Sequence, residues 1–465
     1  MSEKASRRDF VKTAAAGIVG FGLGAGVGYG ASQMMAPPPG VARTVTVTQT
    51  AAAKPPKGVP KEPIKIGIAS WFTGPSTMVG EACFGGAQFA ADEINKAGGI
   101  LGRKIEVLKR DIGTPDVTVE AVRRYVLEDK VDLMAGDTGG SNANAIVPHI
   151  EQLKTPFFFQ CSTTVKEVEE LNPNPLYVFR TGEQNLAEPN VAAQIIAREF
   201  PNATKIAGIN PDYVYGREAM MYSMMALNKL APNMKSVLET WPALNATDFS
   251  SHITAVLAAK PDVVITACWG GDFVTLAKQA TAYGLFKETN VVSILGAMAL
   301  NSLTKDIVPP GVWMLHRDYY FMAPAPNLYP LNKWFVTEYR KRTNKYPEFD
   351  VMQVFSGIFA YKQAIERVYA ATGSYPENDE ICRAIQNSQV VSPAGHRVIT
   401  SDGQFINALP YGKTMHHADY PIAILDPKTV GFIQPETVYN PKSLPPVLQY
   451  PLGTGMKYSD WIATW

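Results

Sequence analysis

The stretch Val131–Thr164 decides the fold of this protein. It reads VDLMAG at 131–136, DTGGSNAN at 137–144, AIVPHIEQL at 145–153, TPFFFQ at 155–160 and CSTT at 161–164. Two apolar runs flank a helical segment, and each run ends in small polar residues. Strands of a parallel sheet are covered on both faces and read as continuous apolar runs, so the stretch predicts a strand–helix–strand unit. Both polar clusters then follow the carboxyl ends of strands, where open α/β sheets bind ligands.

The same alternation continues on both sides of this stretch. Apolar runs that read as strands lie at 64–70, 103–111, 205–210, 261–269 and 290–296. Segments with helical periodicity lie between and after them, at 81–97, 116–129, 190–200, 215–230, 272–283, 331–342, 351–371 and 379–387. A small antiparallel addition is expected up to Pro427. Repeated strand–helix alternation predicts an α/β protein with two doubly wound, Rossmann-like lobes, each built on a parallel sheet.

The N-terminus reads as an export signal followed by a linker. Residues 1–31 contain SRRDFVK at 6–12 and then a weakly hydrophobic segment rich in Ala and Gly, the pattern of a Tat signal. That segment is 18 residues long, at the lower edge of spanning length, so an uncleaved membrane anchor is an alternative. Residues 32–63 are rich in Pro, Thr and Ala and predict an extended linker. We therefore expect a periplasmic or extracellular protein.

Composition excludes several classes of function. The 465 residues are 46% hydrophobic and carry 43 basic and 42 acidic side chains, so no nucleic-acid partner is indicated. The four cysteines lie far apart without a CxxC, which predicts buried free thiols and no zinc site. His416 and His417 are adjacent and lack the i, i+4 spacing of a helical metal site. No metal and no cofactor are predicted.

Several motifs together resemble a known family. They are IKIGI at 64–68, TGP at 73–75, GA at 86–87 and the run ADEINKAGGILGRKIE at 91–106, with support from DYVYG at 212–216, WGGDF at 269–273 and KQA at 278–280. These residues resemble type I periplasmic solute-binding proteins, in particular the leucine/isoleucine/valine-binding receptors of branched-chain amino acid ABC transporters and their amide- and urea-binding relatives. The likeness covers roughly residues 64 to 426.

The resemblance implies an architecture and a role. It implies two lobes joined by a hinge of several crossings, a ligand held between them, delivery to an ABC permease and no catalysis. The first lobe is expected to span residues 64–182 plus about 317–408, and the second 183–316 plus about 409–465 with an irregular tail. The expected partners are a small-molecule ligand, the permease subunits and the Tat export machinery. A ligand sensor of the same fold that feeds a signalling partner is the alternative.

The resemblance also points to individual residues. In the family, a Ser four positions after the glycine that ends the third strand holds the ligand carboxylate. Counting from Gly136, that position is Gly140 with Ser141 next, so a backbone N–H at a helix start would take the role. The other positions matched to the family's ligand contacts, or expected to line the same cleft, are Ser162, Thr164, Tyr215, Trp269, Met78, Met298 and Asp272.

One departure from the family bears on the ligand. Amino-acid-binding members carry a carboxylate for the ligand ammonium where this sequence has Met298. A buried ammonium without a partner costs several kcal/mol, which disfavours a plain α-amino acid. The apolar and aromatic candidates for the wall favour a hydrophobic carboxylate or a neutral amide. Asp272, Asp212 or Asp318 would keep amino acids possible if one of them supplied the missing charge.

The same residues have structural interpretations. The Trp and Met positions are also compatible with a simple core, Ser162 and Thr164 with turn or helix caps, and Asp272 with the N-cap of its own helix. GDTGGS at 136–141 is similar to the GDSGG run of trypsin-like proteases, but the nucleophile position holds Thr138 and the pattern is α/β. Cys161 is the only nucleophile near the predicted cleft, and no His is placed to activate it, so no catalytic residues and no enzyme are predicted.

Overall fold

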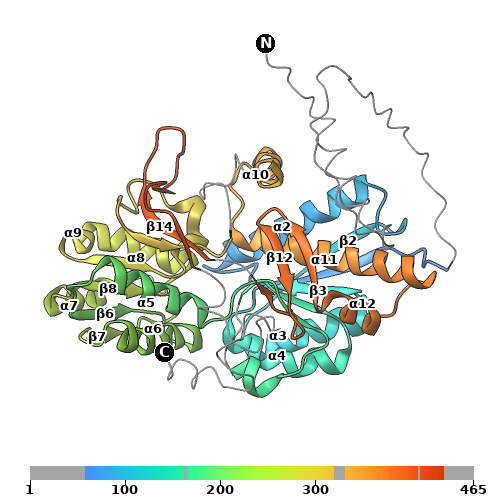
Figure 1. Cartoon of the computed structure of the whole chain (residues 1–465), viewed down its shortest axis with the longest axis horizontal. Coiled ribbons are helices and arrows are strands. Elements are labelled where there is room, and N and C mark those ends of the chain that lie inside the picture. The colour runs from blue at the N-terminus through green and yellow to red at the C-terminus, as the bar shows by residue number, and fades with distance from the viewer. Residues whose placement is uncertain (1–57, 162–163, 165, 319–329, 407–408, 434–465) are drawn as a thin grey trace, which may run out of the picture.

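The computed structural model describes residues 58–161, 164, 166–318, 330–406 and 409–433. The predicted signal, most of the linker, Ser162 and the end of the tail lie outside these ranges. The described residues form two α/β lobes that lie side by side (Figure 1). No helix among them is both long and apolar enough to cross a membrane.

The first lobe is built on a five-stranded sheet with the order β2-β1-β3-β4-β5, and every neighbouring pair is parallel. Its strands are β1 (Ile64–Ser70), β2 (Ile105–Asp111), β3 (Leu133–Gly136), β4 (Phe157–Phe159) and β5 (Val178–Arg180). Its helices are α2 (Thr77–Lys96), α3 (Pro115–Arg124) with the π-turn η2 (Tyr125–Asp129), α4 (Gly140–Leu153), the π-turn η3 (Glu167–Leu171), α11 (Phe349–Thr372) and α12 (Asn378–Ile385). The strand–helix–strand unit predicted from Val131–Thr164 is confirmed as β3, α4 and β4.

The core of this lobe explains why its strands are so apolar. The rings of Phe157 and Phe159 stack with centroids 4.3 Å apart on one face of the sheet, while Phe158 stacks on Phe179 at 4.9 Å on the other. All four side chains are fully buried, and each contributes about 1.5–3 kcal/mol by leaving water. Helix α11 packs directly against the Phe158 ring. A Cβ on Gly357 would lie only 2.9 Å from that ring. A larger residue at this position would lift the helix off the sheet.

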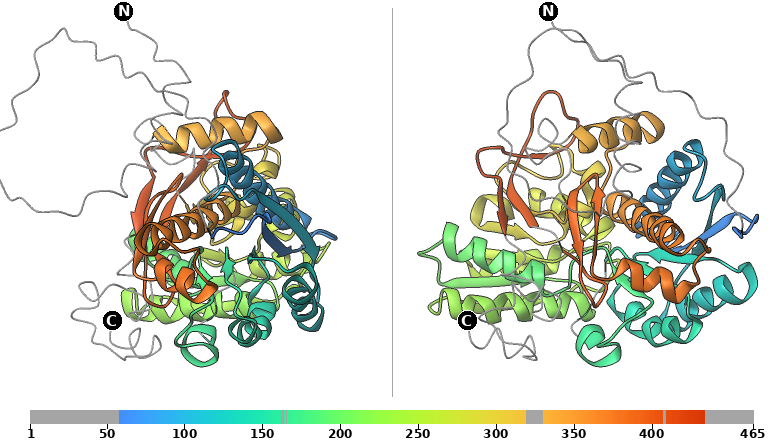
Figure 2. Two further views of the ribbon diagram at one scale, coloured as in Figure 1. Left: turned by 90° about the vertical axis from the view of Figure 1, so that its right-hand side faces the viewer. Right: turned by 45° about the vertical axis from the view of Figure 1, so that its right-hand side comes forward.

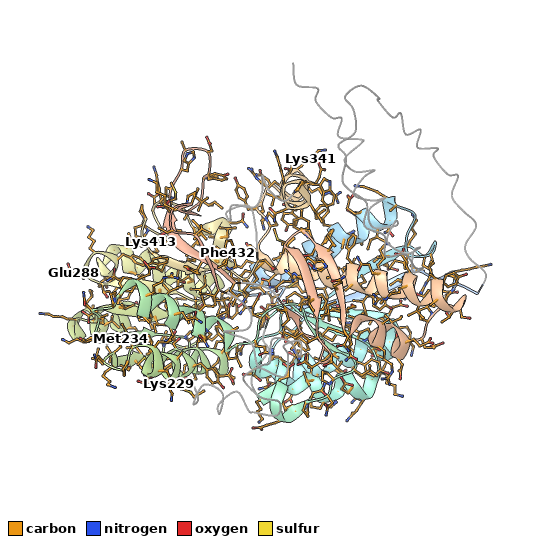
Figure 3. All side chains as sticks on the ribbon, viewed as in Figure 1. Lys229, Met234, Glu288, Lys341, Lys413 and Phe432 are labelled. Carbon is orange, nitrogen blue, oxygen red and sulfur yellow. The ribbon has the colours of Figure 1, made fainter. Side chains whose placement is uncertain are left out.

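The second lobe is built on an eight-stranded mixed sheet whose main path runs β15-β14-β10-β9-β8-β6-β7. The parallel strands are β6 (Lys205–Ile209), β7 (Lys235–Thr240), β8 (Val263–Thr266), β9 (Asn290–Ser293) and β10 (Trp313–Leu315); the antiparallel ones are β14 (Leu409–Met415), β15 (Ile424–Leu425) and β16 (Gly431–Ile433). Its helices are α5 (Ala187–Glu199), α6 (Val214–Leu230), α7 (Ser250–Ala259), α8 (Gly270–Ala282), α9 (Leu285–Glu288) and the 3-10 helix η4 (Gly296–Ser302). Charged side chains such as Lys229 and Glu288 lie at the rim of this lobe (Figure 3).

Strand β7 was not predicted, for a clear reason. It is an edge strand with the sequence KSVLET, and four of its six residues, including Val237, are exposed. An edge strand pairs on one side only and needs no continuous apolar run, so its sequence carries little of the signal by which buried strands are recognised.

Within the described part of the chain, three crossings connect the lobes. The chain leaves the first sheet after β5, leaves the second sheet after β10, and returns to the second sheet between β13 (Phe405–Ile406) and β14. A small antiparallel sheet of β11 (Ser388–Ser392), β12 (Gly395–Ile399) and β13 packs beside α11 (Figure 2). Helix α10 (Pro330–Thr343) lies over α2, where Trp334 stacks on Phe89 with centroids 5.6 Å apart. Two lobes joined by several crossings agree with the predicted fold class.

Candidate ligand-binding site

A narrow cavity lies between the two lobes. The volume that the centre of a water molecule could occupy in it is only about 10 Å³. The first lobe supplies Trp71, Asp137, Gly139, Gly140 and Cys161, and the second supplies Tyr213, Tyr215, Trp269, Leu295 and Met298. These residues follow the carboxyl ends of β1, β3, β4, β6, β8 and β9. This is the edge at which open parallel sheets bind ligands.

Aromatic rings from opposite lobes meet in this cavity. The Trp71 and Trp269 rings lie with centroids 5.6 Å apart at an interplanar angle of 36°. The Trp269 indole Nε1–H donates to the Tyr213 hydroxyl at 2.8 Å, and the Tyr213 ring contacts Tyr215. A flat ligand stacked between the two indoles needs them about 7 Å apart, since atoms in contact are about 3.5 Å apart. The tryptophans must therefore separate before such a ligand enters between them.

Three helices begin at the cavity. They are α4, which starts at Gly140, α6, which starts at Val214, and α8, which starts at Gly270. Among the described residues, no N-cap side chain makes a capping hydrogen bond at any of the three starts. The first N–H groups of a helix have no partner within it and carry partial positive charge, so a helix start favours an anion or a carbonyl oxygen. The cavity thus combines aromatic walls with polarised backbone amides from both lobes.

The structure brings some of the predicted site residues together. Gly140, Tyr215, Trp269 and Met298 line the cavity. Ser141 and Met78 do not, although Met78 lies close to the site: its sulfur is 3.8 Å from where a Cβ on Gly270 would stand. Ser162 lies outside the described residues.

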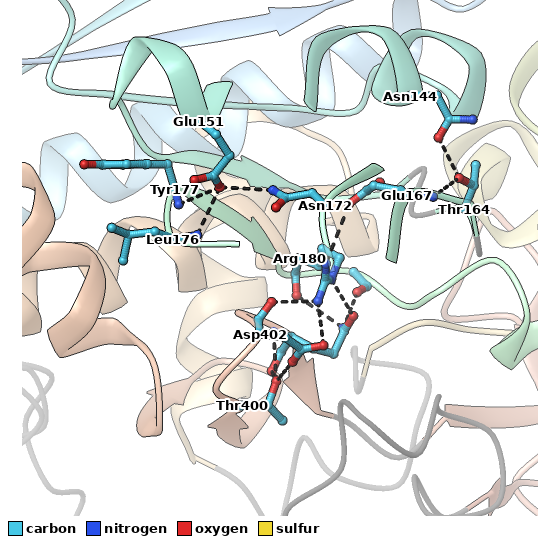
Figure 4. Close-up of polar contacts among 12 residues, drawn as sticks. Asn144, Glu151, Thr164, Glu167, Asn172, Leu176, Tyr177, Arg180, Thr400 and Asp402 are labelled. Atoms are coloured by element: carbon cyan, nitrogen blue, oxygen red, sulfur yellow. Dashed lines mark hydrogen bonds and ion pairs between the residues drawn. The ribbon is translucent and has the colours of Figure 1, made fainter. Parts of the chain in front are cut away.

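Thr164 is placed behind the cavity wall. It is fully buried, and its hydroxyl donates to Asn144 Oδ1 at 2.6 Å and accepts the Glu167 backbone N–H at 3.0 Å (Figure 4). Its methyl group lies 3.0 Å from where a Cβ on Gly140 would stand. The hydroxyl therefore caps the turn η3 and braces α4, and direct contact of Thr164 with a ligand stays a prediction.

The interpretation of Asp272 as the N-cap of its helix was wrong. The chain enters α8 through Trp269, which is extended (φ −138°, ψ 168°), and Asp272 is the third helical residue. Its carboxylate accepts the backbone N–H of Asn245 at 2.9 Å and lies outside the cavity lining. Burial raises the pKa of Asp272 to about 6.

The other two carboxylates considered for a ligand ammonium are also engaged elsewhere. Asp212 pairs with Arg217 at 2.6 Å on the surface, and the buried Asp318 pairs with Arg397. Among the described residues that line the cavity, Asp137 carries the carboxylate. Asp137 was not predicted as a site residue, because counting four positions from Gly136 led to Gly140, further along the loop. Its place directly after a buried strand was the available signal.

A buried ion pair supports the wall of the cavity. The Arg317 guanidinium donates from Nε and Nη2 to the two carboxylate oxygens of Glu188, at 2.5 Å and 2.6 Å. The Tyr215 hydroxyl donates to the same carboxylate at 3.1 Å, and Arg317 Nη1 contacts the Cys161 sulfur. Burial raises the pKa of the Cys161 thiol well above its usual value, so the thiol stays protonated and is a poor nucleophile. No sequence pattern pointed to this role of Arg317.

The buried acids predict how stability depends on pH. Burial raises the pKa of Glu218 and Glu348 to about 7 and that of Glu183 to about 8. In the unfolded chain these groups return to about 4.3. The folded state therefore binds more protons, and the stability that these acids contribute is present at low pH and is lost as the pH rises through 7 to 8. We expect a lower melting temperature at pH 8.5 than at pH 7.0.

The range from pH 7.0 to 8.5 lies above the titration of a buried histidine that changes stability in the opposite direction. Burial lowers the pKa of His316 to about 3, which reduces stability only where an unfolded histidine is protonated, below about 6.5. The variant Glu218→Gln should show a weaker pH dependence in thermal unfolding, since it removes one of the titrating acids. A melting temperature that rises between pH 7.0 and 8.5 would contradict the prediction.

Comparisons with known proteins agree on one family. The family model for periplasmic binding proteins matches residues 63–413. The Leu/Ile/Val-binding protein homolog 4 of Brucella melitensis biotype 1 is 21% identical over 425 residues, which cover 84% of this chain and 92% of that protein.

Solved structures have the same fold. A solute-binding protein of an ABC transporter from Rhodopseudomonas palustris BisB5, in complex with 3,4-dihydroxybenzoic acid, has a TM-score of 0.66 at 24% identity, covering 78% of this chain and 96% of that one. The leucine-binding protein LivK from Thermotoga maritima MSB8 has a TM-score of 0.63 at 18% identity, covering 80% and 99%. This chain therefore belongs to the type I periplasmic binding proteins, in the family of the leucine/isoleucine/valine-binding receptors.

Proposed function

We propose that this protein is the extracytoplasmic substrate-binding protein of an ABC importer of the branched-chain amino acid type. It captures a small solute between its lobes and delivers it to the membrane permease. The observation that carries the proposal is the cavity between the lobes, walled by Trp71 from one lobe and Trp269 from the other. Closure of two lobes on a hinge buries a ligand in such a cavity.

The proposal includes export and domain layout. The twin arginine at Arg7-Arg8 directs the chain through the Tat machinery, and residues 32–63 link the signal to the lobes. The first lobe comprises residues 64–182 and about 317–408, and the second comprises 183–316 and the chain from about 409. The protein works in the periplasm or outside the cell.

The cavity favours a compact solute with an apolar or aromatic body and a polar end. Indole and phenol rings supply a flat apolar surface, and the starts of α4, α6 and α8 supply N–H groups for a carboxylate or carbonyl oxygen. Relatives named for 3,4-dihydroxybenzoic acid and for leucine, isoleucine and valine support hydrophobic carboxylates and amino acids. A neutral amide satisfies the same groups.

The direct test is to identify a bound solute. Native mass spectrometry of the purified, exported protein should detect one small molecule per chain, and calorimetry should then give its affinity. Turnover should be absent, and reconstitution with the permease should give ATP-dependent uptake. Tight binding without uptake would favour the sensor alternative, and failure of the folded protein to bind any acid, amide or amino acid would contradict the proposal.

Removing either cavity indole should weaken binding. We expect Trp71→Ala and Trp269→Ala each to lower affinity by about tenfold, because the loss of one aromatic contact and its buried area is worth about 1–1.5 kcal/mol. Trp334→Ala is the matched control, since Trp334 stacks on Phe89 outside the cavity lining. Calorimetry with the solute found by mass spectrometry measures all three. An equal loss in the control would mean that the effect is general destabilisation.

A further inference from the structure

Two acidic side chains from opposite lobes lie close together near the start of α4. Glu167 belongs to the first lobe and is fully buried, and Glu218 belongs to α6 of the second lobe. Helix α6 begins against α4, since a Cβ on Gly140 would lie 3.8 Å from Cγ1 of Val214. Glu218 follows Val214 by about one helical turn on the same face of α6. The two carboxyl groups are close enough for the charge of Glu218 to raise the pKa of Glu167.

An arginine and an asparagine are the side chains that contact these two acids in the described part of the chain. Arg180 Nη1 lies 3.7 Å from a Glu167 oxygen, too far for a hydrogen bond, and Arg180 also pairs with Asp402 at 2.9 Å (Figure 4). Neither carboxylate oxygen of Glu167 has a hydrogen-bond partner among the described residues. Glu218 Oε2 accepts the Asn185 side-chain N–H at 3.0 Å. Burial is the largest cause that raises the pKa of both acids to about 7.

A third acid is bonded across the boundary between the lobes. Glu348 directly precedes α11 of the first lobe, and its carboxylate accepts the side-chain N–H of Asn301 at 2.8 Å. Asn301 belongs to η4 of the second lobe and also donates to the main-chain oxygen of Tyr346 at 2.9 Å. Burial raises the pKa of Glu348 to about 7, although Asn301 and Lys345 act in the opposite direction. The charge of Glu348 in turn raises the pKa of Asp350.

Separation of the lobes would return these acids to water. The pKa of a hydrated glutamate is about 4.3, so the closed arrangement binds more protons than an open one. The stabilisation that these acids give to closure is therefore fully present below about pH 4.3 and is lost as the pH rises through about 7. Across that interval, each such acid changes the ratio of closed to open molecules by up to about tenfold per pH unit.

We propose that closure of the lobes takes up protons at Glu167, Glu218 and Glu348, so that the protein holds its solute more tightly at acidic than at neutral pH. The inference rests on the proposed function, because closure is the step that buries the solute. Even one of these acids should lower the ratio of closed to open molecules by about tenfold or more between pH 5.5 and pH 7.5.

Energy transfer between two dyes measures closure without any solute. Gln88→Cys on α2 and Lys278→Cys on α8 introduce thiols at exposed positions of opposite lobes, on helices that contact each other. The four native cysteines are buried, so the dyes should react with the introduced ones. Single-molecule measurements should show the high-transfer population at pH 5.5, and its ratio to the low-transfer population should fall at least about tenfold by pH 7.5.

Glutamine variants identify the acids responsible. Glutamine keeps an acceptor oxygen for Asn185 or Asn301 and cannot ionise, so Glu218→Gln and Glu348→Gln should each weaken the pH dependence of closure. The double variant should change by less than about threefold over the same range. Glu120→Gln removes an exposed acid of α3 and should keep the native pH profile.

The outcomes separate this inference from the proposed function. A transfer efficiency that stays constant or rises between pH 5.5 and pH 7.5 would overturn the inference, and so would a native pH profile in the double variant. If Glu348→Gln does not fold, Glu218→Gln decides, because Glu218 is only half-buried and its replacement is mild. Solute binding measured at a single pH does not depend on these results, so their failure leaves the proposed function standing.

Discussion

Replacing Gly271 with phenylalanine is expected to weaken solute binding by about 100-fold, because filling a packed contact costs about 1–3 kcal/mol and 1.4 kcal/mol is a factor of ten. Gly271 is the second residue of α8 and faces the first lobe. A Cβ on Gly271 would lie 3.1 Å from the backbone oxygen of Pro75 and 3.7 Å from its Cβ. A phenyl ring has no room there unless the lobes move apart.

The loss should arise from the lobe arrangement and not from contact with the ligand. Gly271 does not line the cavity, but separating α8 from Pro75 also separates Trp269 from Trp71. If only a small fraction of the molecules can close, the apparent dissociation constant rises in inverse proportion to that fraction. Small-angle scattering should show a larger radius of gyration for the variant in the presence of solute.

Two variants serve as controls for this prediction. Lys278→Phe places the same ring at an exposed position of the same helix and should bind solute normally. Gly271→Ala adds one methyl group at a distance to which the neighbour can adjust, so a small effect is expected. Unchanged affinity and unchanged dimensions for Gly271→Phe would show that the lobes need not meet at this point.

Replacing Arg317 with methionine is expected to lower the free energy of unfolding by about 3–5 kcal/mol, which is typical when one partner of a buried ion pair is removed. Arg317 is 1% exposed, as is Glu188, and the pair is bidentate. Among the residues that the structure describes, the Tyr215 hydroxyl then remains as the hydrogen-bond donor to the buried Glu188 carboxylate. Urea unfolding followed by fluorescence measures the change.

A double variant distinguishes the lost charge from lost packing. Arg317→Met with Glu188→Leu removes both charges and should recover most of the stability, because an apolar pair of similar volume often replaces a buried ion pair without loss. Arg124→Ala breaks an exposed pair with Glu120 and should cost less than about 1 kcal/mol. If Arg317→Met costs less than about 1 kcal/mol, then Glu188 forms another hydrogen bond or ion pair in the variant, or becomes protonated.

The double variant also bears on the site. Glu188 is hydrogen-bonded both to Arg317, which follows β10, and to Tyr215, which lines the cavity. The double variant should therefore be stable but bind solute less tightly than the native protein. Full affinity in the stable double variant would show that the pair serves stability alone.

The sequence by itself determined the α/β architecture. Continuous apolar runs such as Phe157–Phe159 mark strands buried on both faces, and the segments between them have helical periodicity, so both signals depend only on residues close together in the chain. Element ends were less certain: α2 begins at Thr77, four residues before the predicted start at Glu81, because the loop and the first helical turn share small polar residues. The strand ends also located the region of the cavity.

Only the tertiary structure decided which side chains form the site. Arg317 and Cys161 are 156 residues apart in the chain and meet at the cavity wall, and Tyr213, Leu295 and Asp137 join them from three different loops. Thr164, which the family pattern favoured, donates to Asn144 behind Gly140, and its contact with a ligand stays a prediction. Local sequence specifies periodicity and turn chemistry, whereas contacts across a cavity depend on how two separately folded sheets pack against each other, and no short stretch of the chain encodes that packing.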